Sequence, residues 1–198
     1  MSYLEKNFAF YASYHSDTIN VAVHIICVWP LLWTGQAMLA LLALPGPVAE
    51  AVDSALPPAV APYAGANWAL VGTLVYVLYY IVLDHKAGFL AAALVVAGNA
   101  AANHLVATYP GELVLKAAAG IHIGCWVAQI AAHKIFEGRA PALLDNLAQA
   151  FLMAPYFVML EIIMHLGYEP SPGFIKRATA RAAEARAEFE ASQKTKAS

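Results

Sequence analysis

The stretch between Ile19 and His133 constrains this chain more than any other feature, because it is long, apolar and almost uncharged. Its few charged residues are Glu50, Asp53, Asp84, Lys86, Glu112 and Lys116. A helix needs about 20 mostly apolar residues to cross the hydrocarbon core of a bilayer. The segments that meet this requirement are Ile19–Leu44, Ala66–Leu83, Gly88–Thr108 and Leu113–Ala132, with Leu147–Leu166 as a fifth candidate. Backbone groups in lipid must be hydrogen-bonded internally, so we predict an all-α integral membrane bundle of four to five spans.

The composition excludes several other classes of protein. The chain has 198 residues, of which 61% are hydrophobic and 12% charged, against about 25% charged in soluble domains. Its net charge of −2 leaves no basic surface for nucleic acid. Its two cysteines, Cys27 and Cys125, are too few for a disulfide framework and form no CxxC pair.

A polar tail follows the last apolar segment. After Pro170 the composition changes to Ala, Glu and Arg, which predicts a charged, solvated helix. We therefore expect a membrane-embedded domain over residues 1–168 and a polar helical tail over residues 169–198. Asp145 and Asn146 are expected to cap the helix of the last apolar segment.

The orientation in the membrane is only weakly indicated. The basic residues of the tail favour a cytoplasmic location by the positive-inside rule. Pro155 lies within the last apolar segment and leaves open whether that segment crosses the membrane. The alanine-rich composition and short loops favour a bacterial inner membrane, or the endoplasmic reticulum if the protein is eukaryotic.

Polar side chains inside a membrane are costly and are therefore candidates for function. His122 and His133 are separated by a rotation of about 1100° at about 100° per residue, which leaves them only about 20° from a common helix face. Gln129 and Glu137 continue this stripe and are expected to line the same site. The resulting polar seam must face other helices rather than lipid.

A second pair, His15 and His24, would point to opposite faces of an unbroken helix. The run Ser16–Asn20 between them is rich in helix-capping residues. We therefore expect a short N-terminal helix to end near His15 and a new helix to start at Thr18 or Asn20. The turn between the two helices would bring both histidines to one pocket.

Histidines gathered at one membrane face predict a metal site, because neutral imidazole is the commonest protein ligand for first-row metals. The candidate ligands are His15, His24, His122 and His133. The alternative is that each ring is simply hydrogen-bonded within the bundle. Spacing alone does not identify the metal.

The segments that carry these histidines resemble those of the fungal 2-hydroxy fatty acid dioxygenase family. The matching motifs are Tyr11-x-x-Tyr14-His15 followed by Asn20-x-x-x-His24, then His122-x-x-x-Trp126-x-x-Gln129-x-x-x-His133, and the run HKIFEGRAPALLDNL over residues 133–147. This run is the most specific signal, and the resemblance covers roughly residues 3–168. Ala132 departs from the family, which usually has Gly before the histidine; the added methyl group removes no ligand.

The resemblance implies an iron(II)-dependent membrane enzyme of fatty-acid α-oxidation. Such an enzyme uses O2 to shorten a long-chain 2-hydroxy fatty acid by one carbon. The catalytic and metal-binding histidines of the family carry over onto His15, His24, His122 and His133. The remaining histidines match no motif of the family: His85, His104 and His165.

The implied reaction balances without a further reductant. Conversion of R–CH(OH)–COOH to R–COOH and CO2 removes four electrons, and O2 accepts four. The substrate can chelate iron through its hydroxyl and carboxylate groups. Four histidines and two substrate oxygens already fill six positions. We therefore expect either three direct histidine ligands with the fourth outside the coordination sphere, or a substrate bound through one oxygen.

Other polar residues near the seam have two alternative interpretations each. Lys134 or Arg139 either holds the substrate carboxylate or is an ordinary positive-inside anchor. Glu137 either orients a ligand imidazole or pairs with Arg139. Tyr11 and Tyr14 either donate hydrogen bonds to bound oxygen or lie at the membrane interface.

Two other functions are compatible with the histidines. A haem-binding electron-transfer protein would use axial pairs such as His24 with His122, and a non-catalytic metal-binding membrane protein would use the same ligands without turnover. The repeated HxxC spacing of His24-Cys27 and His122-Cys125 is better explained as small apolar packing than as a zinc site. The clustered histidine boxes of membrane hydroxylases and desaturases are not present in the sequence.

Overall fold

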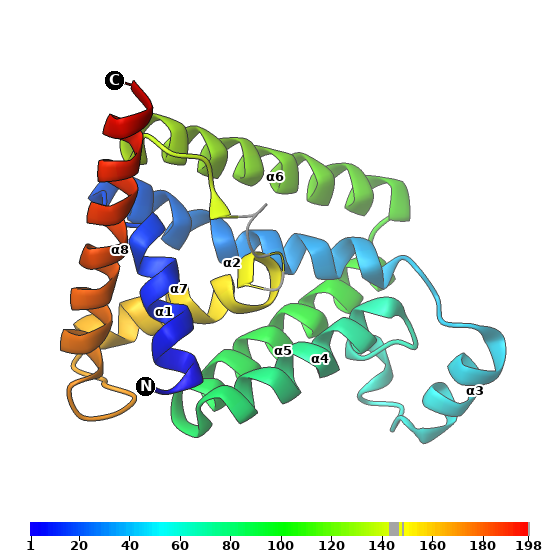
Figure 1. Cartoon of the computed structure of the whole chain (residues 1–198). Helices are drawn as coiled ribbons and strands as arrows, with labels where there is room; N and C mark the ends of the chain where they lie inside the picture. The colour runs from blue at the N-terminus through cyan, green and yellow to red at the C-terminus, as the bar shows by residue number, and fades with distance from the viewer. Residues whose placement is uncertain (143–146, 148, 198) are drawn as a thin grey trace. The chain divides into compact units, whose positions relative to one another are not determined.

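The computed structural model describes residues 1–142, 147 and 149–197 of the chain (Figure 1). These residues form helices and no strands, apart from one isolated bridge between Ala43 and Asn67, which confirms the all-α prediction. They divide into two compact units: unit 1 is Met1–Ile25 with Ala128–Ser198, and unit 2 is Ile26–Val127. The boundary expected between residues 168 and 169 stays a prediction.

The helices follow one another with short connections. Their bounds are α1 Tyr3–Tyr14, α2 Thr18–Ala40, α3 Gly46–Ala55, η1 Ala61–Tyr63, α4 Trp68–Leu83, α5 His85–Thr108, α6 Gly111–Ala132, η2 His133–Glu137, η4 Gln149–Met153, α7 Ala154–His165 and α8 Phe174–Ala197. Of these, η1 is a 3-10 turn, whereas η2 and η4 are π-helical turns. The predicted cap of Asp145 and Asn146 lies outside the described residues.

Among the described residues, three helices are long and apolar enough to cross a membrane: Thr18–Ala40, His85–Thr108 and Gly111–Glu137. The predicted count of four to five spans is therefore not confirmed. α4 has only 16 residues, because the Asn67 side chain caps its start and Asp84 ends it. Gln149–His165 is likewise a shorter apolar helix. The apolar helices nevertheless indicate a membrane protein.

The predicted break before the first span is confirmed. α1 ends at Tyr14 and α2 begins at Thr18. The Asp17 carboxylate accepts hydrogen bonds from the backbone N–H groups of Ile19 at 2.8 Å and Asn20 at 3.3 Å, so it satisfies donors that the first helical turn leaves open.

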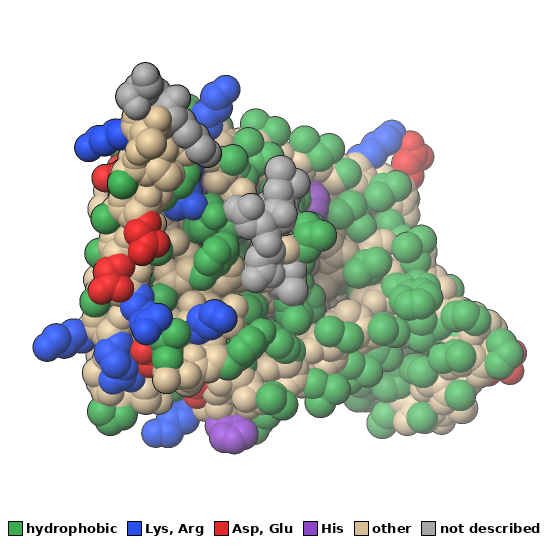
Figure 2. Space-filling view, in the orientation of Figure 1, with side chains coloured by type: hydrophobic (Ala, Val, Ile, Leu, Met, Phe, Trp, Pro, Cys, Tyr) green, Lys and Arg blue, Asp and Glu red, His purple; other side chains and the backbone are tan. Residues whose placement is uncertain are grey.

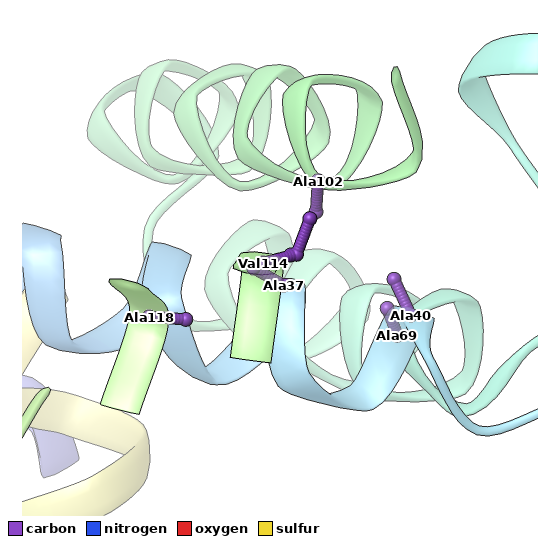
Figure 3. Packing of buried hydrophobic residues seen from close by; sticks show 6 residues of the cluster. All are labelled: Ala37, Ala40, Ala69, Ala102, Val114 and Ala118. Atoms are coloured by element: carbon purple, nitrogen blue, oxygen red, sulfur yellow. The ribbon is translucent and has the colours of Figure 1, made fainter. Parts of the chain in front are cut away.

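Small residues allow the helices of unit 2 to pack closely. Its core cluster consists almost entirely of alanine: Ala37, Ala40, Ala69, Ala102 and Ala118, with Val114 (Figure 3). Small side chains let helix backbones approach, which is how helices associate where lipid supplies no hydrophobic driving force between them. Many large apolar side chains point outward instead, as Val82 does with 82% exposure.

Unit 1 is built on aromatic and charged contacts. The Phe8 ring on α1 lies 5.5 Å from that of Phe157 on α7 and 5.6 Å from that of Phe174 on α8. α8 runs alongside α1 (Figure 1). The charged C-terminal helix that the sequence predicted is therefore packed on the N-terminal helix. In Figure 2, charged side chains gather mainly over this part of the chain, and apolar side chains dominate the rest of the visible face.

Candidate metal centre

Three histidines from three segments of unit 1 converge. His15 follows the last residue of α1, His24 lies on α2, and His133 begins the π-helical turn after α6. Their ligand nitrogens all lie within 4.8 Å of one another. The ring centroids are 4.4 Å apart for His15 and His24 and 4.8 Å for each of the other two pairs, with interplanar angles of 71–81°. The three rings therefore bring one ligand nitrogen each close enough to share a metal ion.

Backbone carbonyls fix the tautomers of two of these rings. His15 Nδ1 lies 2.7 Å from the Tyr11 carbonyl oxygen, and His24 Nδ1 lies 2.9 Å from that of Asn20. A carbonyl can only accept, so each Nδ1 carries the proton and donates it, and each Nε2 keeps its lone pair. This is the usual arrangement of metal-ligating histidines.

Two ring nitrogens of the cluster are buried without a partner. Among the described residues, neither His15 Nε2 nor His133 Nδ1 has a hydrogen bond. Such orphaned groups are rare and call for a ligand, water or ion. Burial, followed by the proximity of His24, lowers the pKa of His15 well below its ordinary value. Its ring is therefore neutral at physiological pH, the form that binds metals, and the donor set fits a first-row metal ion.

The π-helical turn determines where His133 and Glu137 lie. It spans His133–Glu137 and ends at Gly138, whose φ of +66° is a left-handed conformation that glycine adopts without strain. π-helical turns inside α-helices occur frequently at functional sites. Within this turn both His133 and Glu137 are buried, at 2% and 9% exposure.

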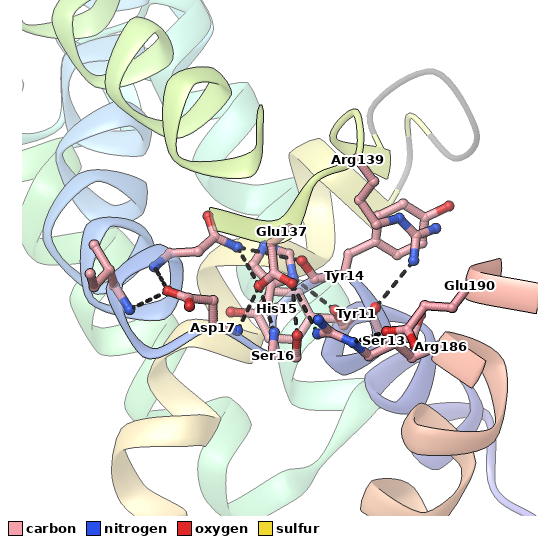
Figure 4. A network of polar contacts seen from close by, with 12 residues as sticks. Tyr11, Ser13, Tyr14, His15, Ser16, Asp17, Glu137, Arg139, Arg186 and Glu190 are labelled. Atoms are coloured by element: carbon pink, nitrogen blue, oxygen red, sulfur yellow. Dashed lines mark hydrogen bonds and ion pairs between the residues drawn. The ribbon is translucent and has the colours of Figure 1, made fainter. Parts of the chain in front are cut away.

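Glu137 connects the segments that carry the histidines (Figure 4). Its Oε1 accepts hydrogen bonds from the backbone N–H of Ser16 at 2.6 Å, from that of Asp17 at 2.8 Å and from Asn20 Nδ2 at 3.0 Å. Its Oε2 accepts one from Ser16 Oγ at 2.7 Å and forms an ion pair with Arg186 at 3.2 Å. The carboxylate thus holds the backbone just before α2 from a distant part of the chain. Its ion-pair partner among the described residues is Arg186 and not Arg139; pairing with Arg139 was one of the two roles expected for Glu137.

Comparison with known proteins places the chain in a family. Residues 1–166 match the model of the family described as 2-hydroxy-palmitic acid dioxygenase Mpo1-like. The chain belongs to this family. It is 30% identical over 168 residues to the 2-hydroxy-palmitic acid dioxygenase MPO1 of Saccharomyces cerevisiae, covering 84% of this chain and 83% of the yeast protein. No solved structure matches the chain.

The residues expected to bind a carboxylate in this Mpo1-like chain differ in their surroundings. Arg139 lies 3.3 Å above the centre of the Tyr14 ring and 4.2 Å from that of Phe189, and it donates to the Ser13 carbonyl at 3.2 Å. Lys134 is exposed on the π-helical turn. The role of either residue in binding substrate stays a prediction.

Tyr11 contacts the cluster in a way that the sequence did not reveal. Its ring stacks on His15 with centroids 4.0 Å apart, and its hydroxyl donates to Glu161 Oε2 at 3.3 Å. Glu161 was not among the predicted site residues. Its carboxylate within an apolar segment could have marked it as a candidate, but its partner Tyr11 lies 150 positions away in the sequence. Gln129 and Tyr14, both predicted near the site, are buried in unit 1.

His122 belongs to unit 2 and is not part of the three-histidine group. Its Nε2 accepts a hydrogen bond from Trp126 Nε1 at 3.2 Å. Its Nδ1 therefore carries the proton and donates to Thr34 Oγ1 at 3.0 Å. Thr34 Oγ1 in turn donates a hydrogen bond to the Pro30 carbonyl at 2.7 Å. Both nitrogens of His122 are thus engaged, whereas His15 Nε2 and His133 Nδ1 have no hydrogen-bond partner among the described residues.

Proposed function

We propose that this chain is an iron(II)-dependent dioxygenase that shortens long-chain 2-hydroxy fatty acids by one carbon with O2 and releases CO2. Membership of the Mpo1-like family supports a dioxygenase role. The observation that carries the proposal is the cluster of His15, His24 and His133, in which His15 Nε2 and His133 Nδ1 are buried and have no hydrogen-bond partner among the described residues.

These three histidines would hold the metal. Iron(II) bound there would supply the redox chemistry for O2 and a binding point for the hydroxyl and carboxylate oxygens of the substrate. With three protein ligands, the metal would keep room for both substrate oxygens. This count supports the first of the two arrangements expected from the sequence, in which the fourth histidine, His122, lies outside the coordination sphere.

The other residues of the site would keep the ligands in place. The carbonyls of Tyr11 and Asn20 hold two rings in the tautomer that presents Nε2. Tyr11 packs one face of His15 and excludes water from it. Glu137 fixes the turn between His15 and α2. Fixed ligands reduce the reorganisation needed when substrate binds.

The apolar helices suit a substrate with a long acyl chain. Such a chain partitions into the bilayer and can reach the protein from lipid, while its polar head stays near the membrane face. We propose a membrane-embedded catalytic domain within residues 1–168, located in a bacterial inner membrane, or in the endoplasmic reticulum if the protein is eukaryotic.

The proposal is tested by replacing each histidine of the cluster with alanine in the full chain purified in detergent. We expect His15→Ala, His24→Ala and His133→Ala each to lose bound iron and to lower turnover of 2-hydroxypalmitate by more than about 100-fold, since loss of outer partners alone costs about 10–100-fold. Iron content and formation of the acid one carbon shorter are the measurements.

Two variants serve as controls, His85→Ala and His165→Ala, because neither residue belongs to the cluster. Both should keep iron and activity. A Soret band in the purified protein, or variants of the cluster that retain iron while the controls lose it, would contradict the proposal.

A further inference from the structure

The C-terminal helix α8 lies beyond the residues that match the family, which end at residue 166, yet it is firmly attached to unit 1. Near its start Phe174 is buried at 1% exposure against Phe8. One turn later Arg177 forms hydrogen bonds with both carboxylate oxygens of Glu5 at 3.0–3.2 Å. α8 is therefore held along α1 by specific contacts and not by apolar packing alone.

Farther along α8, Arg186 contacts the polar network beside the histidines (Figure 4). Its Nη1 donates to Glu137 Oε2 at 3.2 Å, and its Nε donates to Glu190 Oε1 at 3.0 Å. The Glu137 side chain is 1% exposed, whereas that of Arg186 is 37% exposed. A buried carboxylate needs a partner of opposite charge. In the part of the chain that the structure describes, Arg186 is the cation paired with this carboxylate.

Glu137 links Arg186 to the segments that carry all three histidines. It binds the N–H of Ser16, the residue that follows His15. It also binds the side chain of Asn20, whose carbonyl accepts the Nδ1 proton of His24. Finally, it shares the π-helical turn with His133. One carboxylate thus touches every segment that supplies a ligand.

We propose that Arg186 is a positioning residue of the metal centre, so that the C-terminal helix is a functional part of the catalytic unit. The inference rests on the proposed function. Arg186 holds the Glu137 carboxylate in one orientation, and Glu137 holds the histidine-bearing segments at the spacing that a metal requires. Without Arg186, the Glu137 carboxylate keeps its other hydrogen-bond donors but loses the positive charge that balances it. The three histidines are then held less firmly, while the helices stay folded.

The test measures metal binding by the full chain in detergent under anaerobic conditions, with Co2+ as the probe because its d–d absorption reports ligand geometry. Arg186→Gln is expected to raise the dissociation constant about tenfold, the lower end of the range for losing an outer partner of a ligand, and to shift the d–d bands. Arg186→Lys keeps the charge and should recover most of the affinity. The matched control is Glu190→Gln, which removes the other partner of Arg186 and should bind Co2+ like the wild type.

The possible outcomes separate this inference from the proposed function. An Arg186→Gln protein that binds Co2+ within twofold of the wild type with an unchanged spectrum would overturn the inference, even if its apo form melts at a lower temperature, because the role of Arg186 would then be purely structural. If the wild type binds no Co2+, or if His133→Ala binds it equally well, the proposed function itself fails and the inference fails with it.

Discussion

The residues around each histidine decide what its ring can bind. In His15 and His24, a backbone carbonyl four residues earlier accepts the Nδ1 proton and leaves Nε2 available. In His122, Trp126 donates to one nitrogen and Thr34 accepts from the other. Such a ring has no lone pair left for a metal unless these hydrogen bonds break.

This difference leads to a prediction for His122→Ala. We expect the variant to keep its iron and to lose about 1–2 kcal/mol of stability, the net value of the hydrogen bonds that the ring makes with Thr34 on α2 and Trp126 on its own helix. His133→Ala should instead lose the iron. Iron content and thermal unfolding of both variants in detergent are the measurements. Equal loss of iron from the two proteins would show that His122 is a ligand, and the substrate would then bind through one oxygen.

At the level of single residues, the sequence predicted the features that depend on residues nearby in the chain. The capping residues after His15 correctly indicated the break that brings His15 to His24. Helical periodicity predicted that His122 and His133 share a face, and this stays a prediction. It could not show that Trp126 and Thr34 would occupy both nitrogens of His122. The contact of Tyr11 with Glu161 joins residues 150 positions apart, beyond the reach of any local pattern.

Among the elements, the α4–α5 hairpin shows how closely two helices can pack. A Cβ atom added to Gly88 would overlap the backbone carbonyl of Tyr80, a group that cannot move without shifting α4. The turn at Asp84 connects the two helices. Glycine at position 88 therefore sets the distance between α4 and α5.

We predict that Gly88→Ala lowers the stability of the protein by about 1–3 kcal/mol or more, the usual cost of overpacking. Gly120→Ala is the matched control, because Gly120 lies inside α6 with nothing within 4 Å of an added Cβ. That substitution should be neutral or stabilising by up to about 1 kcal/mol, since alanine favours the helix over glycine. Thermal unfolding in detergent checks both. A Gly88→Ala protein as stable as the Gly120→Ala protein would contradict the close contact.

The elements themselves were predicted better than their ends. Apolar runs located α2, α4, α5, α6 and α7, since lipid leaves helices as the economical structure. They did not indicate α3, which is a short helix among prolines. The span count was less certain, because Asn67 and Asp84 cap α4 at 16 residues. The π-helical turn at His133–Glu137 was not predicted, because its register depends on the contacts of Glu137 with Ser16 and Asp17.

Across the whole molecule, the beginning and the end of the chain are joined by one ion pair. Glu5 on α1 is 3% exposed and binds Arg177 on α8. Composition predicted a charged C-terminal helix, but not that one of its arginines would meet a buried carboxylate 172 positions earlier. The attachment of α8, and with it the position of Arg186, depends on this contact.

The ion pair predicts a specific pH dependence of stability. The Arg177 guanidinium lowers the pKa of Glu5 below its ordinary value of 4.5, so the folded state favours the ionised carboxylate more than the unfolded state does. Its contribution is therefore complete above pH 4.5 and is lost as the pH falls through the lowered pKa of the folded protein. We expect Glu5→Gln to melt below the wild type at neutral pH, and the two melting temperatures to converge in acid. Glu112→Gln removes an exposed ion pair with Lys116 and should change little at any pH. A difference between wild type and Glu5→Gln that persists or grows in acid would show that the pair does not hold α8 to α1.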